Sequence, residues 1–256
     1  MGQGDTILLL HGASGSTHSW RDVMDDLAVD HHVIALDLPG HGLTKLGSRH
    51  RSSLPLMAQD VVSVLHDQGW QPKAILSHSA GAALGIRVSQ LLGSNTPVIA
   101  VNPALTPFKG FAGVLFPIAA RVVAMSPFMV NMIKRRMSGP GQVISLMDTT
   151  GSKISPEGLN LYAKLLRSKD HVDGTLLMMA HWKLDGLLAD LPNITIPCTF
   201  LVGENDKAVP PSSVKDVARK MPNAKVISFG GYGHLMHEEA ADLVADQLRD
   251  VLRKYT

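Results

Sequence analysis

Ser79 stands within the run Ser77-His78-Ser79-Ala80-Gly81, in which every residue except His78 is small. An apolar stretch at residues 74–76 precedes this run, and a helix-like stretch follows it at residues 82–88. A serine between a strand and a helix, with a small residue two positions away on each side, is typical of the G-x-S-x-G turn that exposes a nucleophilic hydroxyl. Ser77 replaces the first glycine of that pattern. We therefore predict that Ser79 is a nucleophile.

Two further side chains could activate this hydroxyl, which is a poor nucleophile without a general base. Asp206 lies in the loop after a buried-type apolar run at 198–202, and His234 follows a second run at 225–229 through a glycine-rich stretch. We predict that His234 is the general base and that Asp206 orients it. The sequence contains no metal-ligand cluster, so neither a metal nor a cofactor is expected.

An oxyanion hole would complete such a site, because backbone N–H groups near the nucleophile stabilise the charge that develops on the substrate oxygen. The first apolar run, residues 6–10, leads into the loop His11-Gly12-Ala13-Ser14-Gly15-Ser16. We predict that one N–H donor is that of Ala13. The second would be the N–H of Ala80, directly after the nucleophile.

Apolar runs and helical patterns alternate along the chain. Parallel strands are apolar on both faces because helices cover both sides of the sheet. Runs of this kind occur at residues 7–10, 33–36, 74–76, 98–101, 199–202 and 226–229. Helical periodicity lies between most of them, notably at 53–68, and again at 243–252. The pattern predicts an α/β fold with a doubly wound, mostly parallel sheet.

Serine, aspartate and histidine occur here in the order found in α/β-hydrolases. The stretch Asp37-Leu38-Pro39-Gly40-His41-Gly42 also resembles the D-x-P-G-x-G turn of that superfamily. Together with the His11-Gly12 loop, these motifs make the chain resemble the α/β-hydrolase superfamily, which implies an α/β-hydrolase fold with a helical cap insertion. That superfamily has two strands before the His-Gly loop. Because only five residues precede the first apolar run, we expect these two edge strands to be absent.

The long segment between the fourth and fifth apolar runs predicts the cap. We expect residues 1–103 and 191–256 to form the core and residues 104–190 to form a mainly helical cap or lid. The segment holds seven of the 12 methionines, and methionine adapts its shape to bulky apolar ligands. The alternative is that these side chains only pack the cap onto the core. The candidates for a substrate pocket are Phe108, Phe111, Phe116, Met125, Met129, Met178 and Trp182.

Four further stretches of sequence indicate a particular family within the α/β-hydrolase superfamily. They are residues 11–21, 102–108, 150–152 and 178–182, and they resemble the family of magnesium-chelatase accessory proteins of bacteriochlorophyll biosynthesis. The resemblance implies a role beside the insertion of magnesium into protoporphyrin. It also implies an apolar small-molecule substrate related to tetrapyrroles, and magnesium-chelatase subunits as partners.

Charge and composition exclude several other classes of function. The net charge is +2, and 24 basic and 22 acidic residues are interspersed, so no nucleic-acid surface is expected. The single cysteine, Cys198, lies in a predicted strand and excludes an intramolecular disulfide. The amino terminus lacks a signal-type pattern, which favours a cytoplasmic location. The apolar segment 111–133 is compatible with peripheral contact of the protein with a photosynthetic membrane.

Three functions remain compatible with the sequence. The leading hypothesis is a serine hydrolase of the esterase type that acts on a bulky apolar ester as an accessory to magnesium chelatase. The second is a non-catalytic accessory that binds porphyrin or chelatase subunits. The third is a general carboxylesterase. The ordered Ser79, Asp206 and His234 favour an enzyme, because the residues of an accessory that only binds need no such order.

Overall fold

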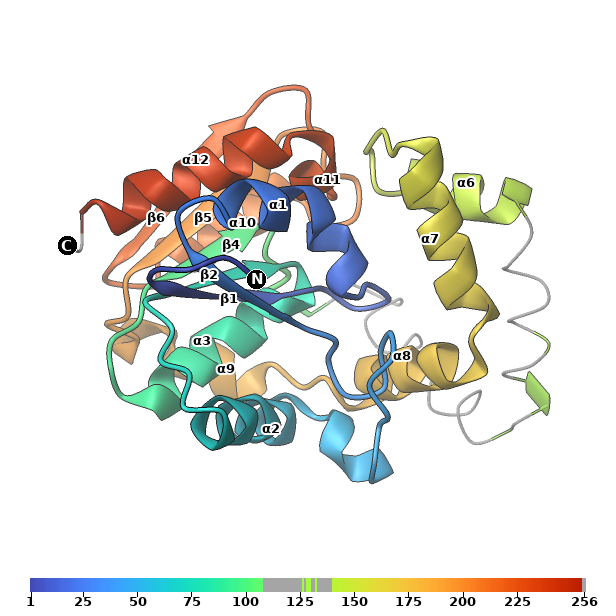
Figure 1. The fold of residues 1–256 in the computed structure, drawn as a ribbon, viewed down its shortest axis with the longest axis horizontal. Coiled ribbons are helices and arrows are strands. Elements are labelled where there is room, and N and C mark those ends of the chain that lie inside the picture. Colours follow the sequence, from blue (N-terminus) through green and yellow to red (C-terminus); the bar gives the residue numbers. More distant parts are fainter. Residues whose placement is uncertain (108–125, 127, 130–131, 133–139, 255–256) are drawn as a thin grey trace.

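A six-stranded parallel sheet forms the centre of the protein in a computed structural model, which describes residues 1–107, 126, 128–129, 132 and 140–254 (Figure 1). The strand order is β2-β1-β3-β4-β5-β6, and every neighbouring pair is parallel. The strands are β1 (Thr6–Leu10), β2 (His32–Leu36), β3 (Ala74–His78), β4 (Val98–Val101), β5 (Cys198–Gly203) and β6 (Ala224–Phe229). The predicted doubly wound, parallel architecture is confirmed.

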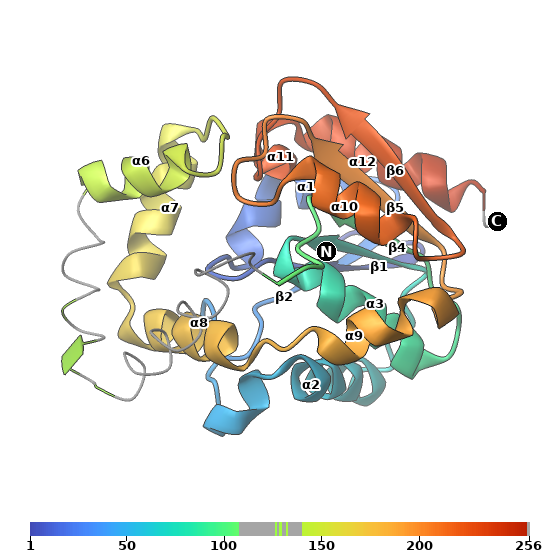
Figure 2. The ribbon, with the colours of Figure 1, turned by 180° about the vertical axis from the view of Figure 1, so that it is seen from behind.

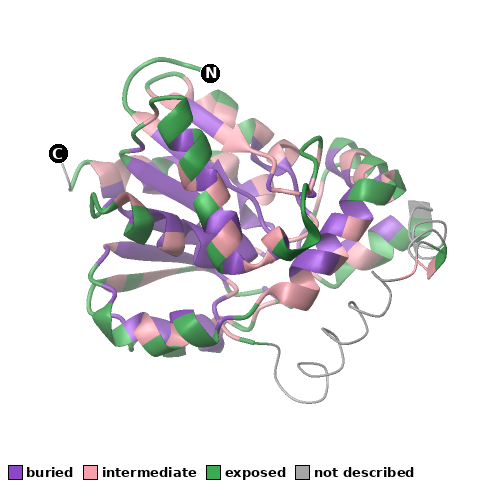
Figure 3. Cartoon of the chain, turned by 90° about the horizontal axis from the view of Figure 1, so that it is seen from below, coloured by how far each residue is buried: buried purple, intermediate pink, exposed green. Residues whose placement is uncertain are grey.

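Helices cover both faces of the sheet. Alternate residues of a strand point to opposite faces, and in β1 Leu8 and Leu10 join one apolar cluster whereas Ile7 and Leu9 join the other. The first cluster includes α2 (Leu54–Asp67), α3 (Ala80–Leu92) and α10 (Pro211–Ala218). The second includes α1 (Arg21–Leu27) and α12 (Ala241–Leu252). Figure 3 shows the resulting pattern of buried strands and helices that expose their outer sides.

The sheet ends at β2 within the described part of the chain. Beyond β2, Met1 lies along the strand edge, where its amino group donates to Val33 O at 2.8 Å and its carbonyl accepts from Val33 N at 2.7 Å. Met1 therefore covers part of the outer edge of β2. Short helical turns complete the core: η1 (Thr17–Trp20), η2 (Arg49–Ser52), η3 (Leu191–Asn193) and α11 (Met236–Glu239).

The described part of the insertion is helical. It contains α6 (Pro140–Asp148), α7 (Pro156–Arg167), α8 (Lys169–His181) and α9 (Asp185–Asp190). Figures 1 and 2 both show α6, α7 and α8 grouped at one side of the sheet. In contrast, α9 packs on the core, because Leu187 is buried in the first cluster and Asp190 pairs with Arg87 of α3 at 2.7 Å. We refer to α6, α7 and α8 as the cap helices.

Helix α8 attaches the cap helices to two loops of the core. A Cβ atom on Gly174 would lie 2.1 Å from Gly40 O, so the helix approaches the turn after β2 backbone to backbone. One turn earlier, His171 Nδ1 accepts from Gly42 N at 3.0 Å, and its Nε2–H donates to Ser14 O at 3.3 Å. None of the helices in the described ranges combines the length and apolarity needed to cross a bilayer.

Candidate functional site

Ser79 occupies the sharp turn between β3 and α3. Its φ of 52° and ψ of −120° form a strained conformation for a residue with a side chain. Gly81 permits the turn, because a Cβ atom there would lie 2.5 Å from Leu10 O. Ser77, which replaces the first glycine of the motif, is fully buried, and its hydroxyl donates to Ile99 O at 3.2 Å. The buried hydroxyl of Ser77 is therefore satisfied by a hydrogen bond to β4.

His234 and Asp206 lie next to Ser79, each in a loop that leaves the carboxyl end of a strand. His234 Nε2 lies 3.0 Å from Ser79 Oγ, and His234 Nδ1 lies 2.7 Å from Asp206 Oδ2. The side chain of Asp206 is 1% exposed, and its other oxygen accepts from the N–H groups of Ala208 and Val209 at 2.8 Å each. This chain of hydrogen bonds can carry a proton from the serine hydroxyl to the imidazole.

Two residues that the sequence did not single out for this task fix the carbonyl of His234. Asn102, directly after β4, donates from Nδ2 to His234 O at 2.9 Å and to Gly233 O at 2.8 Å, and its Oδ1 accepts from Gly203 N at 2.8 Å. His78 Nε2 donates to His234 O at 3.0 Å. A polar side chain at the carboxyl end of a central strand is the sequence signal that could have identified Asn102.

The two predicted oxyanion donors are the N–H groups of Ala80 and Ala13. Ala80 is the first residue of α3, so its N–H has no carbonyl one helical turn earlier to accept it. Ala13 lies in the turn that Gly15 N closes onto Gly12 O at 3.1 Å, and its own N–H has no acceptor among the described residues. A Cβ atom on Gly12 would lie 2.9 Å from the Ser79 Cβ, so this loop passes close to the nucleophile.

The half-buried Asp37 and the buried His11 hold the loop that carries Ala13. Asp37 accepts from Thr17 N at 2.7 Å and from Leu43 N at 2.9 Å, and it thus joins the loops after β1 and β2. His11 Nε2 accepts from Leu38 N at 3.0 Å. The turn formed by residues 37–42 therefore supports the geometry of the site without a reactive group of its own.

The predicted pocket residues have different surroundings. Phe108, Phe111, Phe116 and Met125 lie outside the described residues. Met129 is half-buried, with its N–H 3.4 Å from Ser126 Oγ. Met178 is 1% exposed within the first apolar cluster, and Trp182 packs against the same cluster. For Met178 and Trp182, these contacts favour the alternative in which insertion side chains pack the cap onto the core.

Five buried histidines and the half-buried His18 have lowered pKa values, which favours their neutral form. Burial lowers the pKa of His11 and of His18 from 6.5 to about 4, and the pKa of the other four is lowered by the same cause. Those four are His41, His78, His171 and His237. Burial also raises the pKa of the Cys198 thiol to about 12, so this cysteine is a poor nucleophile. Within the described ranges, no three His, Cys, Asp or Glu side chains gather in a metal-binding group.

Because the pKa values of these histidines are lowered in the folded protein, we expect the protein to lose stability in mild acid. An unfolded histidine binds a proton near pH 6.5, whereas folded His11 does so only near pH 4. The neutral buried imidazole therefore contributes fully to the unfolding free energy above pH 6.5, and this contribution is lost as the pH falls toward 4. Between pH 6.5 and pH 5, protonation of His11 in the unfolded chain should cost about 2 kcal/mol of unfolding free energy. Urea unfolding at pH 7.5 and at pH 5 measures this difference.

His237 provides the sharpest variant for this experiment. Neither of its ring nitrogens has a hydrogen-bond partner among the described residues, so His237→Phe leaves no partner unsatisfied. Because burial keeps the pKa of His237 well below 6.5, this variant should lose measurably less unfolding free energy than the wild type between the two pH values. His66→Gln, a change at an exposed histidine, should lose as much as the wild type. Equal losses in all three proteins would contradict the assignment.

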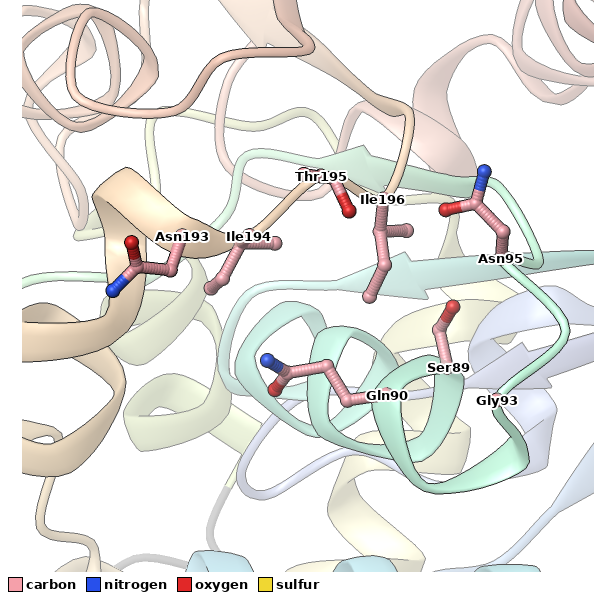
Figure 4. A pocket seen from close by; sticks show the side chains of 8 residues that line it. All are labelled: Ser89, Gln90, Gly93, Asn95, Asn193, Ile194, Thr195 and Ile196. Carbon is pink, nitrogen blue, oxygen red and sulfur yellow. The ribbon is translucent and has the colours of Figure 1, made fainter.

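A separate hollow of about 440 Å³ lies at the far end of α3 from Ser79 (Figure 4). Ser79 and Gly93 cap opposite ends of this 13-residue helix, which puts the hollow roughly 20 Å from the serine. Its lining carries no acid or base that titrates near neutral pH, so it is not part of the site. The lining residues are Ser89, Gln90, Gly93, Asn95, Asn193, Ile194, Thr195 and Ile196.

Comparison with known proteins agrees with the fold. A model of the "Alpha/beta hydrolase family" matches residues 7–247. The chain is 38% identical over 252 residues to the "Magnesium-chelatase 30 kDa subunit" of Rhodobacter capsulatus, which covers 97% of this chain and 87% of the relative. The predicted resemblance to magnesium-chelatase-related proteins is thereby confirmed.

Two more distant similarities involve esterases. The chain is 22% identical over 253 residues to the "Pimeloyl-(acyl-carrier protein) methyl ester esterase" of Xanthomonas axonopodis pv. citri, with 97% of this chain and 95% of the relative covered. A thermophilic esterase from Thermogutta terrifontis superposes with a TM-score of 0.78 at 22% identity, covering 99% of this chain and 91% of that one. At this identity the structural match shows the shared fold.

Proposed function

Since this chain belongs to the α/β-hydrolase family, we propose that it is a serine esterase in which Ser79, His234 and Asp206 form the catalytic triad. The observation that carries the proposal is the pair of hydrogen bonds at 3.0 Å and 2.7 Å that connects the three side chains. Family membership supports hydrolase activity in general. The serine-esterase chemistry is our inference from this arrangement.

In the proposed reaction, Ser79 Oγ attacks the carbonyl carbon of an ester while His234 Nε2 accepts the hydroxyl proton. Asp206 Oδ2 accepts the hydrogen bond from Nδ1–H and holds the imidazole in the tautomer that leaves Nε2 free. The N–H groups of Ala13 and Ala80 stabilise the oxyanion. His234 then returns the proton to the departing alcohol, and a water molecule releases the acyl group from Ser79 by the same steps.

The proposed substrate is a bulky apolar ester, related to tetrapyrroles, that is processed beside magnesium chelatase. The support comes from the 38% identical relative, whose name assigns it to magnesium chelatase, and from the methyl ester esterase among the other relatives. An esterase acting in this context would remove or exchange an ester group on a porphyrin side chain. Chelatase subunits are the partners we propose.

A panel of esters tests this function. Purified protein should hydrolyse nitrophenyl esters, with a kcat/KM that rises with acyl length, and should release methanol from a porphyrin monomethyl ester. Turnover of short nitrophenyl esters with no release from the porphyrin ester would support a general carboxylesterase instead. If the folded protein hydrolyses none of these esters above background, the esterase proposal is wrong.

A non-catalytic accessory is the second candidate, and the similarity to a chelatase subunit over nearly the whole chain favours it. Such a protein would bind porphyrin or chelatase subunits without turnover. Quenching of porphyrin fluorescence and pull-down with chelatase subunits, both performed with Ser79→Ala, separate binding from catalysis. Binding without any ester turnover by the wild type would establish this candidate in place of the enzyme.

A further inference from the structure

Residues 150–152, shortly after the end of α6, lie between the loops of Asp206 and His234. His234 N donates to Thr150 O at 2.9 Å, and Lys207 N donates to the same oxygen at 3.3 Å. One carbonyl of the insertion thus binds the backbone of the proposed base and the residue next to the proposed acid. The relative position of these two loops therefore depends on a segment that comes from neither of them.

Ser152 adds a side-chain contact to this arrangement. Its Oγ accepts from Leu235 N, directly after His234, at 2.8 Å, and its own N–H donates to Thr150 Oγ1 at 3.2 Å. Ser152 is 9% exposed, so water cannot readily replace the bond. The serine therefore fixes the peptide that follows the imidazole-bearing residue.

The backbone packing leaves no room for this segment to shift. Gly151 has a φ of 75°, and a Cβ atom on it would lie 2.1 Å from Asn205 O. On the other side, a Cβ atom on Gly233 would lie 2.3 Å from the carbonyl carbon of Gly151. The three backbones are in direct contact, which only glycine permits at these two positions.

Two carboxylates of α11 extend the connection to the cap. Glu239 accepts from Gly233 N and from Lys153 N, both at 2.9 Å, so one side chain binds the histidine loop and the segment after residue 152. Its neighbour Glu238 accepts from Tyr162 of α7 at 2.6 Å and from Arg21 at 2.9 Å. The insertion and the histidine loop are therefore joined at several points.

We propose that residues 150–152 position the catalytic base, and that Ser152 is a positioning residue for His234. This inference rests on the esterase function proposed above. The segment closes the gap between the acid loop and the base loop, so that Nδ1 of His234 stays on Asp206 while Nε2 faces Ser79.

Ser152→Ala tests the proposal against a matched control, Ser155→Ala. Both serines belong to the insertion and accept one backbone N–H, but Ser155 Oγ accepts from Gly158 N at 3.1 Å at the start of α7, whereas Ser152 Oγ accepts from Leu235 N in the histidine loop. We expect Ser152→Ala to lower the kcat of ester hydrolysis about ten-fold with KM changed less than two-fold. Ser155→Ala should leave kcat within two-fold of the wild type, and Ser152→Thr, which keeps the hydroxyl, should restore most of the loss.

Amide hydrogen exchange provides a readout that does not depend on turnover. Ser152→Ala should accelerate exchange in peptides covering residues 203–208 and 230–236, whereas Ser155→Ala should accelerate exchange only in α7. Equal kcat and equal exchange in the two alanine variants would overturn the positioning role while leaving the esterase intact. If the wild type itself shows no turnover that depends on Ser79, the proposed function has failed instead, and the positioning of a base falls with it.

Discussion

Replacing Ser79 with alanine is expected to lower kcat for ester hydrolysis by about a million-fold. The hydroxyl would supply the nucleophile, and neither His234 nor Asp206 can replace it, so the loss should equal that seen when a triad serine is removed. Residual catalysis from the oxyanion donors should remain about a thousand-fold above the reaction in water. Steady-state kinetics with an activated ester, at substrate concentrations above KM, measures the change.

Ser77→Ala is the matched control for this variant. The two serines are separated by one residue, and Ser77 is fully buried with its hydroxyl on Ile99 O, away from His234. We expect Ser77→Ala to reduce kcat less than ten-fold and to act mainly on stability, through the loss of one buried hydrogen bond. Similar rates for Ser79→Ala and Ser77→Ala would contradict the role of Ser79 as the nucleophile.

Asp206→Asn is expected to lower kcat by about ten thousand-fold. The amide keeps the size of the carboxylate, and its oxygen can still accept from Ala208 N and Val209 N. Its NH2 group would then face His234 Nδ1, which favours the tautomer with the proton on Nε2. In that tautomer the imidazole cannot accept the proton of Ser79, although the geometry of the site is unchanged.

Glu204→Gln controls for the loss of one negative charge from the same loop. Glu204 is exposed and two residues from Asp206, so its replacement should change kcat less than three-fold because water screens its charge. The comparison uses the same ester and pH for both variants, with urea unfolding to confirm that each is folded. An Asp206→Asn variant within ten-fold of the wild type would show that Asp206 does not control the tautomer of His234.

The strands could be predicted from the sequence because their pattern is local. Continuous apolar runs predicted β1 to β6 within about two residues of the observed bounds, since strands covered by helices on both faces are mostly apolar. The turn at Ser79 could also be predicted, because its pattern is local in the sequence. Gly81 and the small neighbours of Ser79 are needed by a strained backbone that the sequence itself encodes.

The supports of the candidate site could not be predicted in this way. Thr150 acts through its carbonyl oxygen, which every residue has. Its contact with His234 N therefore requires no particular residue type and cannot be predicted from the sequence. Asn102 acts through a common polar side chain that becomes informative only when β4 is known to lie beside β5. The composition of the insertion indicated an apolar lid, but it could not distinguish a pocket side chain from the buried packing observed for Met178.

Covalent labelling by a fluorophosphonate tests the central claim most directly, because this reagent modifies a serine only when a neighbouring base activates its hydroxyl. Intact mass spectrometry should show one adduct for each wild-type chain, and peptide mapping should locate it on Ser79. Ser79→Ala should remain unlabelled, and Asp206→Asn should react far more slowly than Ser77→Ala. A folded wild-type protein that acquires no adduct, or acquires it on another residue, would contradict the assignment of Ser79, His234 and Asp206 as a catalytic triad.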